Sequence, residues 1–501
     1  MSDRAYYVTT PIYYINSVPH IGHAYTSIAA DVLARYARTR GQAFLLTGTD
    51  EHGQKVANAA AEAGVSPQAW TDRMAATWQS LCRRYEISYD DFIRTTEERH
   101  QSVCVEVFER LKVSGDIYVG KYEGWYCTYD ETFWLESKLV DGRCPECRRD
   151  VQWLSEDNWF FALSRYRDRL LEHYRTHPDF VRPQRAYNEM LATLEGGLDD
   201  LCISRTNLDW GVPLPGGGVM YVWLDALLNY ITAIGWSRDE ERFRRYWPAD
   251  VHLIGKEIAR FHTIIWPAVL WALGLPEPKS IFAHGWLTIE GEKISKSRGN
   301  VFDPFATADF FGADTVRYFL LREAPFGADF SWSDEKVRQR RNSDLGNDLG
   351  NLLRRSLTML QRYRDGIVPP VAGASFGERF GDLGERTAGR IVELDFRGAL
   401  AEIWELVSAL NRAIDEQKPW RLYEQGAQHE LDALLYTLCE GLRWLGHLLA
   451  PFIPAKAAEI HQQLGVGDEL GRNWNEALRW GDLTAGQQTR GGEPLFPRLL
   501  D

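Results

Sequence analysis

The hydrophobic pattern of the first fifty residues predicts a strand, a loop, a helix and a second strand. Residues Ala5–Tyr14 are β-branched and aromatic, as in a buried strand, and the loop Asn16–Pro19 follows. From His23 onward apolar residues recur at helical spacing until Gly41 ends the pattern, and Ala43–Leu46 predicts the second strand. Elements in this order form the unit from which parallel sheets are built.

A second group of strand signals lies far downstream. His252–Ile254 and Ser280–Ala283 are short apolar segments between helical stretches, so we expect one parallel sheet assembled from two distant parts of the chain. Between these parts, roughly residues 114–215, the pattern changes to loops rich in Trp and Tyr, as expected of an inserted subdomain. Gly216–Gly218 predicts a short turn or hinge.

From about Asp334 the helical period dominates, and it includes the segments Leu345–Leu360, Ala388–Glu416 and Leu431–Leu449. The C-terminal third is therefore predicted to be all-helical. We expect five parts in total: residues 1–113 and 216–290 as the halves of an α/β domain, 114–215 as the insertion, 291–345 as a connecting region, and 346–501 as the helical domain.

Composition narrows the class of protein. The 501 residues are 45% hydrophobic and 25% charged, which suits a globular protein of several domains. The chain has no basic and apolar leader at its start and no run of about 18 apolar residues, so we expect a cytoplasmic protein that does not enter a membrane.

The net charge of −13 argues against general coating of nucleic acid. Basic residues nevertheless gather locally, and this group predicts either a confined RNA footprint or a solvated helix face. Its members are Lys336, Arg338, Arg340, Arg341, Arg354, Arg355, Arg362 and Arg364.

Seven cysteines are an odd number and sparse for this length, which disfavours a disulfide framework and suggests a metal. Cys127 and Asp130 stand at ligand spacing, and so do Cys144 and Cys147 after thirteen intervening residues. Zinc accepts three thiolates and one carboxylate, and four protein ligands would make the site structural. The alternative is a relic knuckle with reduced thiols.

Two further motifs suit phosphate chemistry. His20-Ile21-Gly22-His23 lies between the first predicted strand and helix, and a helix N-terminus attracts phosphate. Gly22 would leave room for a nucleotide, and His20 and His23 could donate hydrogen bonds to phosphate oxygens. Two histidines at this spacing can equally be structural.

The second motif, Lys293-Ile294-Ser295-Lys296-Ser297, follows the last predicted strand and Gly291. It predicts a mobile loop that presents two ammonium groups to phosphates. Taken alone, it could also be a solvated lysine loop.

Together these motifs, about 270 residues apart across a split parallel sheet, resemble the two signatures of class I aminoacyl-tRNA synthetases. Ile294 stands where the usual form has Met. Further stretches narrow the resemblance to the methionyl-tRNA synthetase family, and such matches extend to Pro497. They are Thr9–Tyr14, Thr47–Gly53, Ser204–Thr206, Tyr221–Ala226, Gly255-Lys256, Phe261-His262 and Trp266–Ala268.

The resemblance implies a class I Rossmann-like α/β catalytic domain with an inserted zinc-knuckle subdomain, followed by an α-helical anticodon-binding domain. It implies that ATP, with Mg²⁺, activates methionine to methionyl-adenylate, and that methionine then passes to the 3′ end of initiator and elongator methionine tRNAs. A monomer is expected, because the C-terminal oligonucleotide-binding domain of dimeric relatives is not found in the sequence.

The resemblance also assigns residues to these roles. Catalysis would fall to His20, Gly22, His23, Lys293 and Lys296, and ATP would be bound by these residues together with Ser295 and Ser297. The methionine pocket would comprise Ile12, Tyr14, Trp223, Ala226, Leu227, Tyr230, Ile258, His262 and Trp266, with Asp50 on the substrate ammonium. Aromatic walls suit a thioether, although Leu227 stands where some relatives carry Pro.

One structural Zn²⁺ per chain would bind to Cys127, Asp130, Cys144 and Cys147. Asn351, Arg355, Pro419 and Trp420 would read the anticodon, since an amide, a guanidinium and an exposed indole can bind splayed bases. Without the resemblance, a helix-capping Asn and a packed Trp are equally good interpretations.

The implied reaction needs no general base in its first step, because the carboxylate of methionine is ionised and attacks the α-phosphorus directly. No base is evident for the transfer step. A synthetase for leucine, isoleucine or valine would need a larger insertion than these roughly 100 residues, and a cysteinyl enzyme would need zinc ligands beside its pocket. An inactive RNA-binding relative would not need both ATP motifs, and a nucleotidyltransferase would leave the helical domain unexplained.

Overall fold

The computed structural model describes residues 4–129, 132–134, 136–206, 208–289, 292–293, 302–370, 374–467 and 469–499. The chain divides into two compact units. The first comprises Met1–Pro19, Phe44–Leu81 and Tyr89–His284, and the second comprises His20–Ala43, Cys82–Ser88 and Gly285–Asp501.

The first unit is built on a parallel sheet with strand order β2-β3-β1-β12-β13-β8, and β4 pairs with β3. The strands are β1 (Tyr6–Thr9), β2 (Tyr13–Tyr14), β3 (Ala43–Asp50), β4 (Asp91–Arg94), β8 (Val181–Arg182), β12 (Val251–Gly255) and β13 (Ile281–His284). Val8 pairs with Val251, and His252 pairs with Ile281, both in parallel register. The prediction of one parallel sheet from two distant parts of the chain is confirmed.

The single strand predicted for Ala5–Tyr14 is wrong, because the structure divides it into β1 and β2. Strand β1 pairs with β12, whereas β2 pairs with the last residues of β3. Pro11 lies between the two strands and has no backbone N–H to donate to a ladder. Strand β3 is longer than predicted and continues to Asp50.

Helices accompany this sheet, and the apolar side chains of most of them form one core with those of the strands. They are α2 (Gln54–Glu62), α3 (Pro67–Arg84), α4 (Glu98–Ser114), α5 (Arg167–Thr176), α6 (Gln184–Glu195), α7 (Val222–Leu227), α8 (Asn229–Thr232), α9 (Glu240–Tyr246) and α10 (Trp266–Ala272). Single turns are η1 (Glu136–Lys138), η2 (Leu163–Tyr166), η3 (Lys256–Ile258) and the π-helical turn η4 (Phe261–Ile265).

The inserted region contains regular strands where mainly loops were expected. An antiparallel sheet has the order β6-β5-β7-β9, with β5 (Ile117–Cys127), β6 (Thr132–Trp134), β7 (Gln152–Phe161) and β9 (Leu201–Cys202). The Trp and Tyr residues that suggested loops instead form cross-strand pairs, such as Trp125 with Trp153 at 5.5 Å between ring centres. Strands β10 (Ser204–Arg205) and β11 (Val219–Met220) also pair, and Gly216–Gly218 forms the predicted turn with positive φ throughout.

The first helix of the second unit is α1 (Ile21–Arg38). A small sheet with the order β15-β14-β16 comes later in the sequence, and the remaining helices lie between its strands in the sequence or after them. Its strands are β14 (Leu287–Ile289), β15 (Glu292–Lys293) and β16 (Phe330–Trp332). Its helices are α11 (Pro304–Phe311), α12 (Ala313–Arg322), α13 (Asp334–Arg340), π-helical η6 (Arg341–Gly350), α14 (Asn351–Arg364), α15 (Ala374–Arg379), α16 (Leu383–Val392), α17 (Phe396–Gln417), α18 (Pro419–Glu424), α19 (Gln428–Leu449), α20 (Pro454–Leu464) and α21 (Trp474–Ala477).

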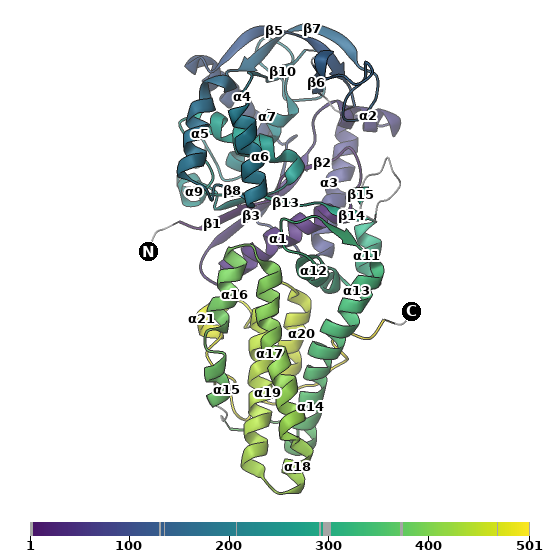
Figure 1. The fold of residues 1–501 in the computed structure, drawn as a ribbon, viewed down its shortest axis with the longest axis vertical. Helices are drawn as coiled ribbons and strands as arrows, with labels where there is room; N and C mark the ends of the chain where they lie inside the picture. The colour runs from purple at the N-terminus through teal and green to yellow at the C-terminus, as the bar shows by residue number, and fades with distance from the viewer. Residues whose placement is uncertain are drawn as a thin grey trace. The chain divides into compact units, whose positions relative to one another are not determined.

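The all-helical prediction for the C-terminal third is confirmed, and the long helices α17 and α19 pack side by side (Figure 1). The one helical segment expected over Ala388–Glu416 is wrong, because α16 ends at Val392 and α17 begins at Phe396. Leu394 has a φ of 62°, and the Asp395 carboxylate caps the new helix by accepting from Gly398 N at 2.9 Å. Among the described residues, no helix has the length and hydropathy to span a membrane.

A buried ion pair anchors α1 within the second unit. The Arg317 guanidinium on α12 donates to Asp31 Oδ2 on α1 at 2.7 Å, and both side chains are fully buried. Arg317 also donates to the carbonyls of Tyr85, Pro451 and Phe452. Burial would raise the pKa of Asp31, but the charges of Arg317 and Arg35 outweigh it and lower that pKa.

Candidate active site and RNA-binding positions

The predicted methionine-binding residues all belong to the first unit, and they divide by exposure into two groups. Leu227, Tyr230, His262 and Trp266 are buried, with at most 5% of their surface exposed. The others are half-buried: Ile12, Tyr14, Asp50, Trp223, Ala226 and Ile258. Ile12, Trp223 and Ile258 pack against the core that contains the buried group. The predicted residues thus comprise a buried aromatic and apolar group and a more exposed group that includes one carboxylate.

Hydrogen bonds fix the protonation of the buried polar pair. His262 Nδ1 lies 3.0 Å from the Ile258 carbonyl, which can only accept, so Nδ1 carries the proton. His262 Nε2 therefore accepts from the Tyr230 hydroxyl, at 2.7 Å. Burial lowers the pKa of His262 to about 4, so its imidazole is neutral at physiological pH.

Two polar residues behind Tyr230 were not predicted from the sequence. The His252 ring stacks on the Tyr230 ring at 4.2 Å between centres, and Thr9 Oγ1 lies 2.8 Å from His252 Nδ1. Thr9 and His252 pair in register on β1 and β12, so the two halves of the sheet meet at this pair. The sequence did contain a signal for Thr9 and His252, since both are polar residues in otherwise apolar strands. A buried strand rarely carries such residues unless each has a specific hydrogen-bond partner.

The more exposed group comes from several segments of the first unit, namely β2 with the residue Ile12 before it, β3, α7 and η3. Tyr14 and Asp50 pair in register on β2 and β3. Trp223 and Ala226 lie on α7, and the Trp223 ring stacks near Phe261 on η4. A half-buried carboxylate can bind an ammonium group, while aromatic and apolar walls can bind an unbranched thioether.

His20 and His23 belong to the second unit, where they cap α1. His20 Nδ1 accepts from Gly22 N at 3.2 Å, His23 Nδ1 accepts from His20 N at 3.1 Å, and the rings stack. A neutral imidazole that accepts at Nδ1 carries its proton on Nε2, which is the tautomer that can donate to a phosphate oxygen. A Cβ on residue 22 would lie 3.0 Å from His20 Cε1, so glycine also permits this stacking.

The lysine motif lies mostly beyond the described part of the chain. Glu292 and Lys293 form β15, but Ser295, Lys296 and Ser297 lie outside the described residues, as does the side chain of Lys293. Their assignment to ATP stays a prediction.

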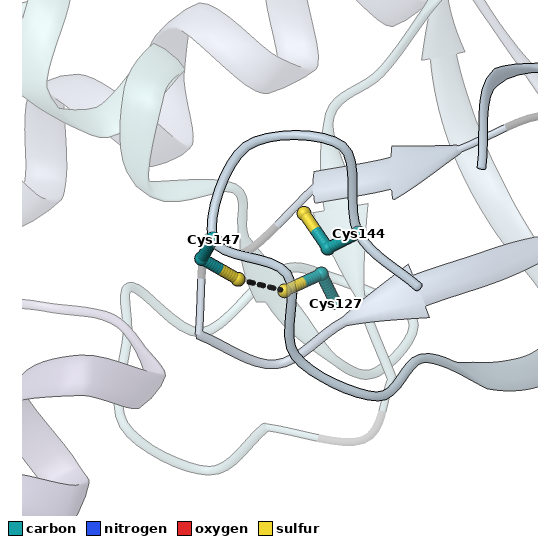
Figure 2. A group of neighbouring side chains, drawn as sticks. All are labelled: Cys127, Cys144 and Cys147. Atoms are coloured by element: carbon teal, nitrogen blue, oxygen red, sulfur yellow. Dashed lines mark hydrogen bonds between the residues drawn. The ribbon is translucent and has the colours of Figure 1, made fainter. Parts of the chain in front are cut away.

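Three of the four predicted zinc ligands come together in the inserted region (Figure 2). The sulfurs of Cys127, Cys144 and Cys147 lie within 4.8 Å of one another, with 3.4 Å between Cys127 Sγ and Cys147 Sγ. None of the three forms a disulfide, and Cys127 and Cys144 are fully buried. Thiolates on one tetrahedral zinc ion lie roughly 3.8 Å apart, so this arrangement fits the ion. Asp130 lies outside the described residues.

The predicted anticodon-binding residues lie on α14 and α18 of the second unit. Asn351 is exposed and continues the helix from η6, so it does not cap a helix end. Trp420 follows the buried Pro419 and is 43% exposed, so it is not a packed core residue. Arg355 bonds to Asp415 at 2.8 Å, while Tyr363 and Tyr423 bring α14 and α18 together at 4.7 Å between ring centres.

Much of the basic segment is used within the second unit. Lys336 pairs with Glu323, Arg340 pairs with Glu323 and Asp344, and Arg341 donates to the Phe311 carbonyl. Exposed guanidinium groups remain at Arg354 and Arg362 on α14. The segment is therefore partly structural, and any RNA contact would concentrate on α14.

Comparison with known proteins decides the family. The model of class I tRNA synthetases (M) matches residues 6–154 and 149–357. The chain belongs to the class I tRNA synthetases, in the methionyl group. A methionine–tRNA ligase from Caldanaerobacter subterraneus subsp. tengcongensis is 49% identical over 99% of this chain and 79% of its own length. One from Thermotoga maritima is 46% identical over 99% of this chain and 80% of its own.

A solved structure gives the same result at the level of the fold. The Mycobacterium tuberculosis methionyl-tRNA synthetase in complex with methionyl-adenylate superposes with a TM-score of 0.94 and 44% identity. That match covers 99% of this chain and all of the other. A class I synthetase with a parallel catalytic sheet and a C-terminal helical region is therefore established.

Proposed function

We propose that this class I synthetase activates L-methionine with ATP, releases pyrophosphate, and transfers methionine from the adenylate to the 3′ end of its tRNA. One observation carries the choice of amino acid. Buried Tyr230 bonds to neutral His262, the half-buried Ile12, Trp223 and Ile258 pack against the core that contains Tyr230, and the carboxylate of Asp50 is among the more exposed group. This arrangement matches an unbranched thioether that bears an ammonium group.

In this proposal the substrate carboxylate is the nucleophile, so the protein positions both substrates and stabilises charge on the departing pyrophosphate. The Nε2–H groups of His20 and His23 donate to phosphate oxygens, since both Nδ1 atoms accept from the backbone. Lys293, Ser295, Lys296 and Ser297 bind the phosphates from their loop. Bound Mg²⁺ would supply further positive charge to ATP.

The remaining roles follow from the same family. Cys127, Cys144, Cys147 and Asp130 hold a structural zinc ion, and the convergence of the three thiols supports this role. Asn351, Arg355, Pro419 and Trp420 contact the anticodon of initiator and elongator methionine tRNAs, which the exposure of Trp420 supports. The protein acts in the cytoplasm as a monomer.

A charging assay tests the whole proposal. Labelled methionine should become acid-precipitable on a transcript of methionine tRNA, only with ATP and only with an intact CAU anticodon. His23→Ala should abolish charging, whereas His429→Ala, at an exposed histidine of the second unit, should retain it. Charging that ignores the anticodon would contradict the assigned RNA contacts, and charging with another amino acid would contradict the pocket.

A further inference from the structure

A buried polar cluster in the first unit is not explained by any of the predicted roles. Its centre is the Asp225 carboxylate on α7, which lies 2.7 Å from His52 Nδ1 and 2.7 Å from His100 Nε2. Cys104 Sγ lies 3.5 Å from the same carboxylate. All four side chains are at least 98% buried. Burying so many polar groups carries a large desolvation penalty, which suggests that the cluster has a role beyond packing.

The distances show that hydrogen bonds hold this cluster together. Two ligands of one tetrahedral zinc ion lie roughly 3.3 Å apart or more, whereas Asp225 Oδ1 and His100 Nε2 are 2.7 Å apart. Each imidazole therefore donates to one carboxylate oxygen. His100 Nδ1 has no partner among the described residues, which agrees with a proton on Nε2. Burial would raise the pKa of Asp225, but the two imidazoles outweigh it and lower that pKa, so the carboxylate is ionised.

The cluster joins the two segments that carry the proposed methionine contacts. Asp225 lies on α7 between Trp223 and Ala226, and His52 lies two residues after Asp50. The buried His52–Asp225 bond therefore ties α7 directly to the segment that follows Asp50.

The segment from Asp50 to Gly53 is also held on its opposite side. The Glu51 carboxylate accepts from Arg94 Nε at 2.7 Å and from the Thr96 hydroxyl. Trp210 Nε1 donates to the Glu51 carbonyl at 2.7 Å. With Glu51 fixed to β4 and its neighbouring loop, and His52 fixed to α7, the backbone that carries Asp50 has little freedom to move.

We propose that Asp225 and His52 are positioning residues that hold the Asp50 carboxylate at the correct distance from the pocket walls on α7. Methionine can then satisfy its ammonium and its thioether at the same time. This inference rests on the proposed function, because it takes Asp50 as the ammonium partner. Loss of the bond should weaken methionine binding while ATP binding and the chemical step remain almost intact.

Variants of His52 provide a sharp test, because asparagine and histidine both carry a nitrogen on Cγ. His52→Asn can keep the donor to Asp225, whereas His52→Leu removes it. In methionine-dependent exchange of pyrophosphate into ATP, His52→Leu should raise KM for methionine about tenfold. KM for ATP and kcat should change less than threefold, and His52→Asn should restore most of the methionine affinity.

The matched control is another buried histidine of the first unit that faces a carboxylate. His173 Nδ1 lies 3.5 Å from Glu277 Oε1, and its ring packs against His177, Phe180 and Trp271. His173→Leu should lower the melting temperature without raising KM for methionine. If it raises that KM as much as His52→Leu does, the effect is general destabilisation and the inference is wrong.

Two other outcomes also decide the question. An unchanged KM for methionine in folded His52→Leu, or equal losses in KM for methionine and ATP, would overturn the positioning role. If the wild-type protein shows no methionine-dependent exchange, the proposed function itself has failed. Should His52→Leu not fold, Asp225→Asn replaces it, since it keeps the size of the side chain while removing the charge.

Discussion

His262 links the chemistry of the pocket to the stability of the protein. Its folded-state pKa of about 4 lies below the ordinary value of 6.5. Between these values the unfolded chain binds a proton that the folded chain does not, so stability falls as the pH decreases from 6.5 towards 4. His262→Gln should make the free energy of unfolding depend less steeply on pH in this range, by up to the equivalent of one bound proton. Denaturant unfolding at several pH values measures this slope. His429→Gln, at an exposed position, should leave the slope unchanged, and a slope unchanged in His262→Gln would show that this imidazole does not titrate as described.

Trp420 should matter for tRNA and not for the first chemical step. Its indole is exposed, and stacking on a base contributes about 1–3 kcal/mol. Trp420→Ala should therefore lower kcat/KM for tRNA charging about tenfold or more, while pyrophosphate exchange stays at the wild-type rate. Tyr423, also exposed on α18, offers a control in Tyr423→Phe, which keeps the ring. A parallel loss of exchange in Trp420→Ala would assign the indole a structural role.

The position of an individual residue in the fold was predictable where a motif places that residue at the end of a helix or strand. His20 and His23 follow a strand and begin a helix, and the structure finds them at the cap of α1. His252 and Asp225 could not be assigned in this way, because their roles depend on partners 243 and 173 residues away. Only the tertiary structure brings such partners together.

Among the elements, the cysteine knuckle gives a direct test of metal binding. Protein purified without chelators should contain about one zinc ion per chain, and Cys147→Ser should lose most of it. Cys439→Ser, a buried thiol in α19, should retain the metal. Metal analysis by mass spectrometry measures both, and wild-type protein that folds and charges tRNA without zinc would favour the relic knuckle.

The ion pair between α1 and α12 should dominate the stability of the second unit. Arg35 would still pair with Asp31, but removing Arg317 takes away the fully buried partner of this carboxylate and the donor to three carbonyls, which should cost about 3–5 kcal/mol. Arg317→Met should therefore lower the free energy of unfolding by that amount. Arg472→Met breaks a half-exposed pair with Glu469 and should cost under about 1 kcal/mol. Equal effects in urea titrations would contradict the central role of Arg317.

Element types followed from periodicity, whereas their boundaries depended on local chemistry. The parallel strands and the long C-terminal helices were predicted correctly. The break after β1 depends on Pro11, and the break between α16 and α17 depends on the Asp395 cap and the left-handed Leu394. In the insertion, the aromatic residues indicated loops, yet they stabilise an antiparallel sheet through cross-strand contacts between β5 and β7.

At the scale of the whole molecule, the chemistry is divided between the two units. The proposed methionine pocket belongs to the first unit, while the histidines that cap α1, the lysine motif and the proposed anticodon contacts belong to the second. The family was predicted from two motifs, His20–His23 and Lys293–Ser297, in this order and on either side of a parallel sheet that is assembled from two distant segments. The comparisons over 99% of the chain confirm it.

The most direct test of this account is exchange of labelled pyrophosphate into ATP, with each of the twenty amino acids supplied separately. We expect exchange with methionine alone, and a loss of about a hundredfold or more in His23→Ala. Exchange with a different amino acid would contradict the pocket while leaving the class intact. Absence of exchange with any amino acid, from folded protein that still binds tRNA, would contradict the catalytic function.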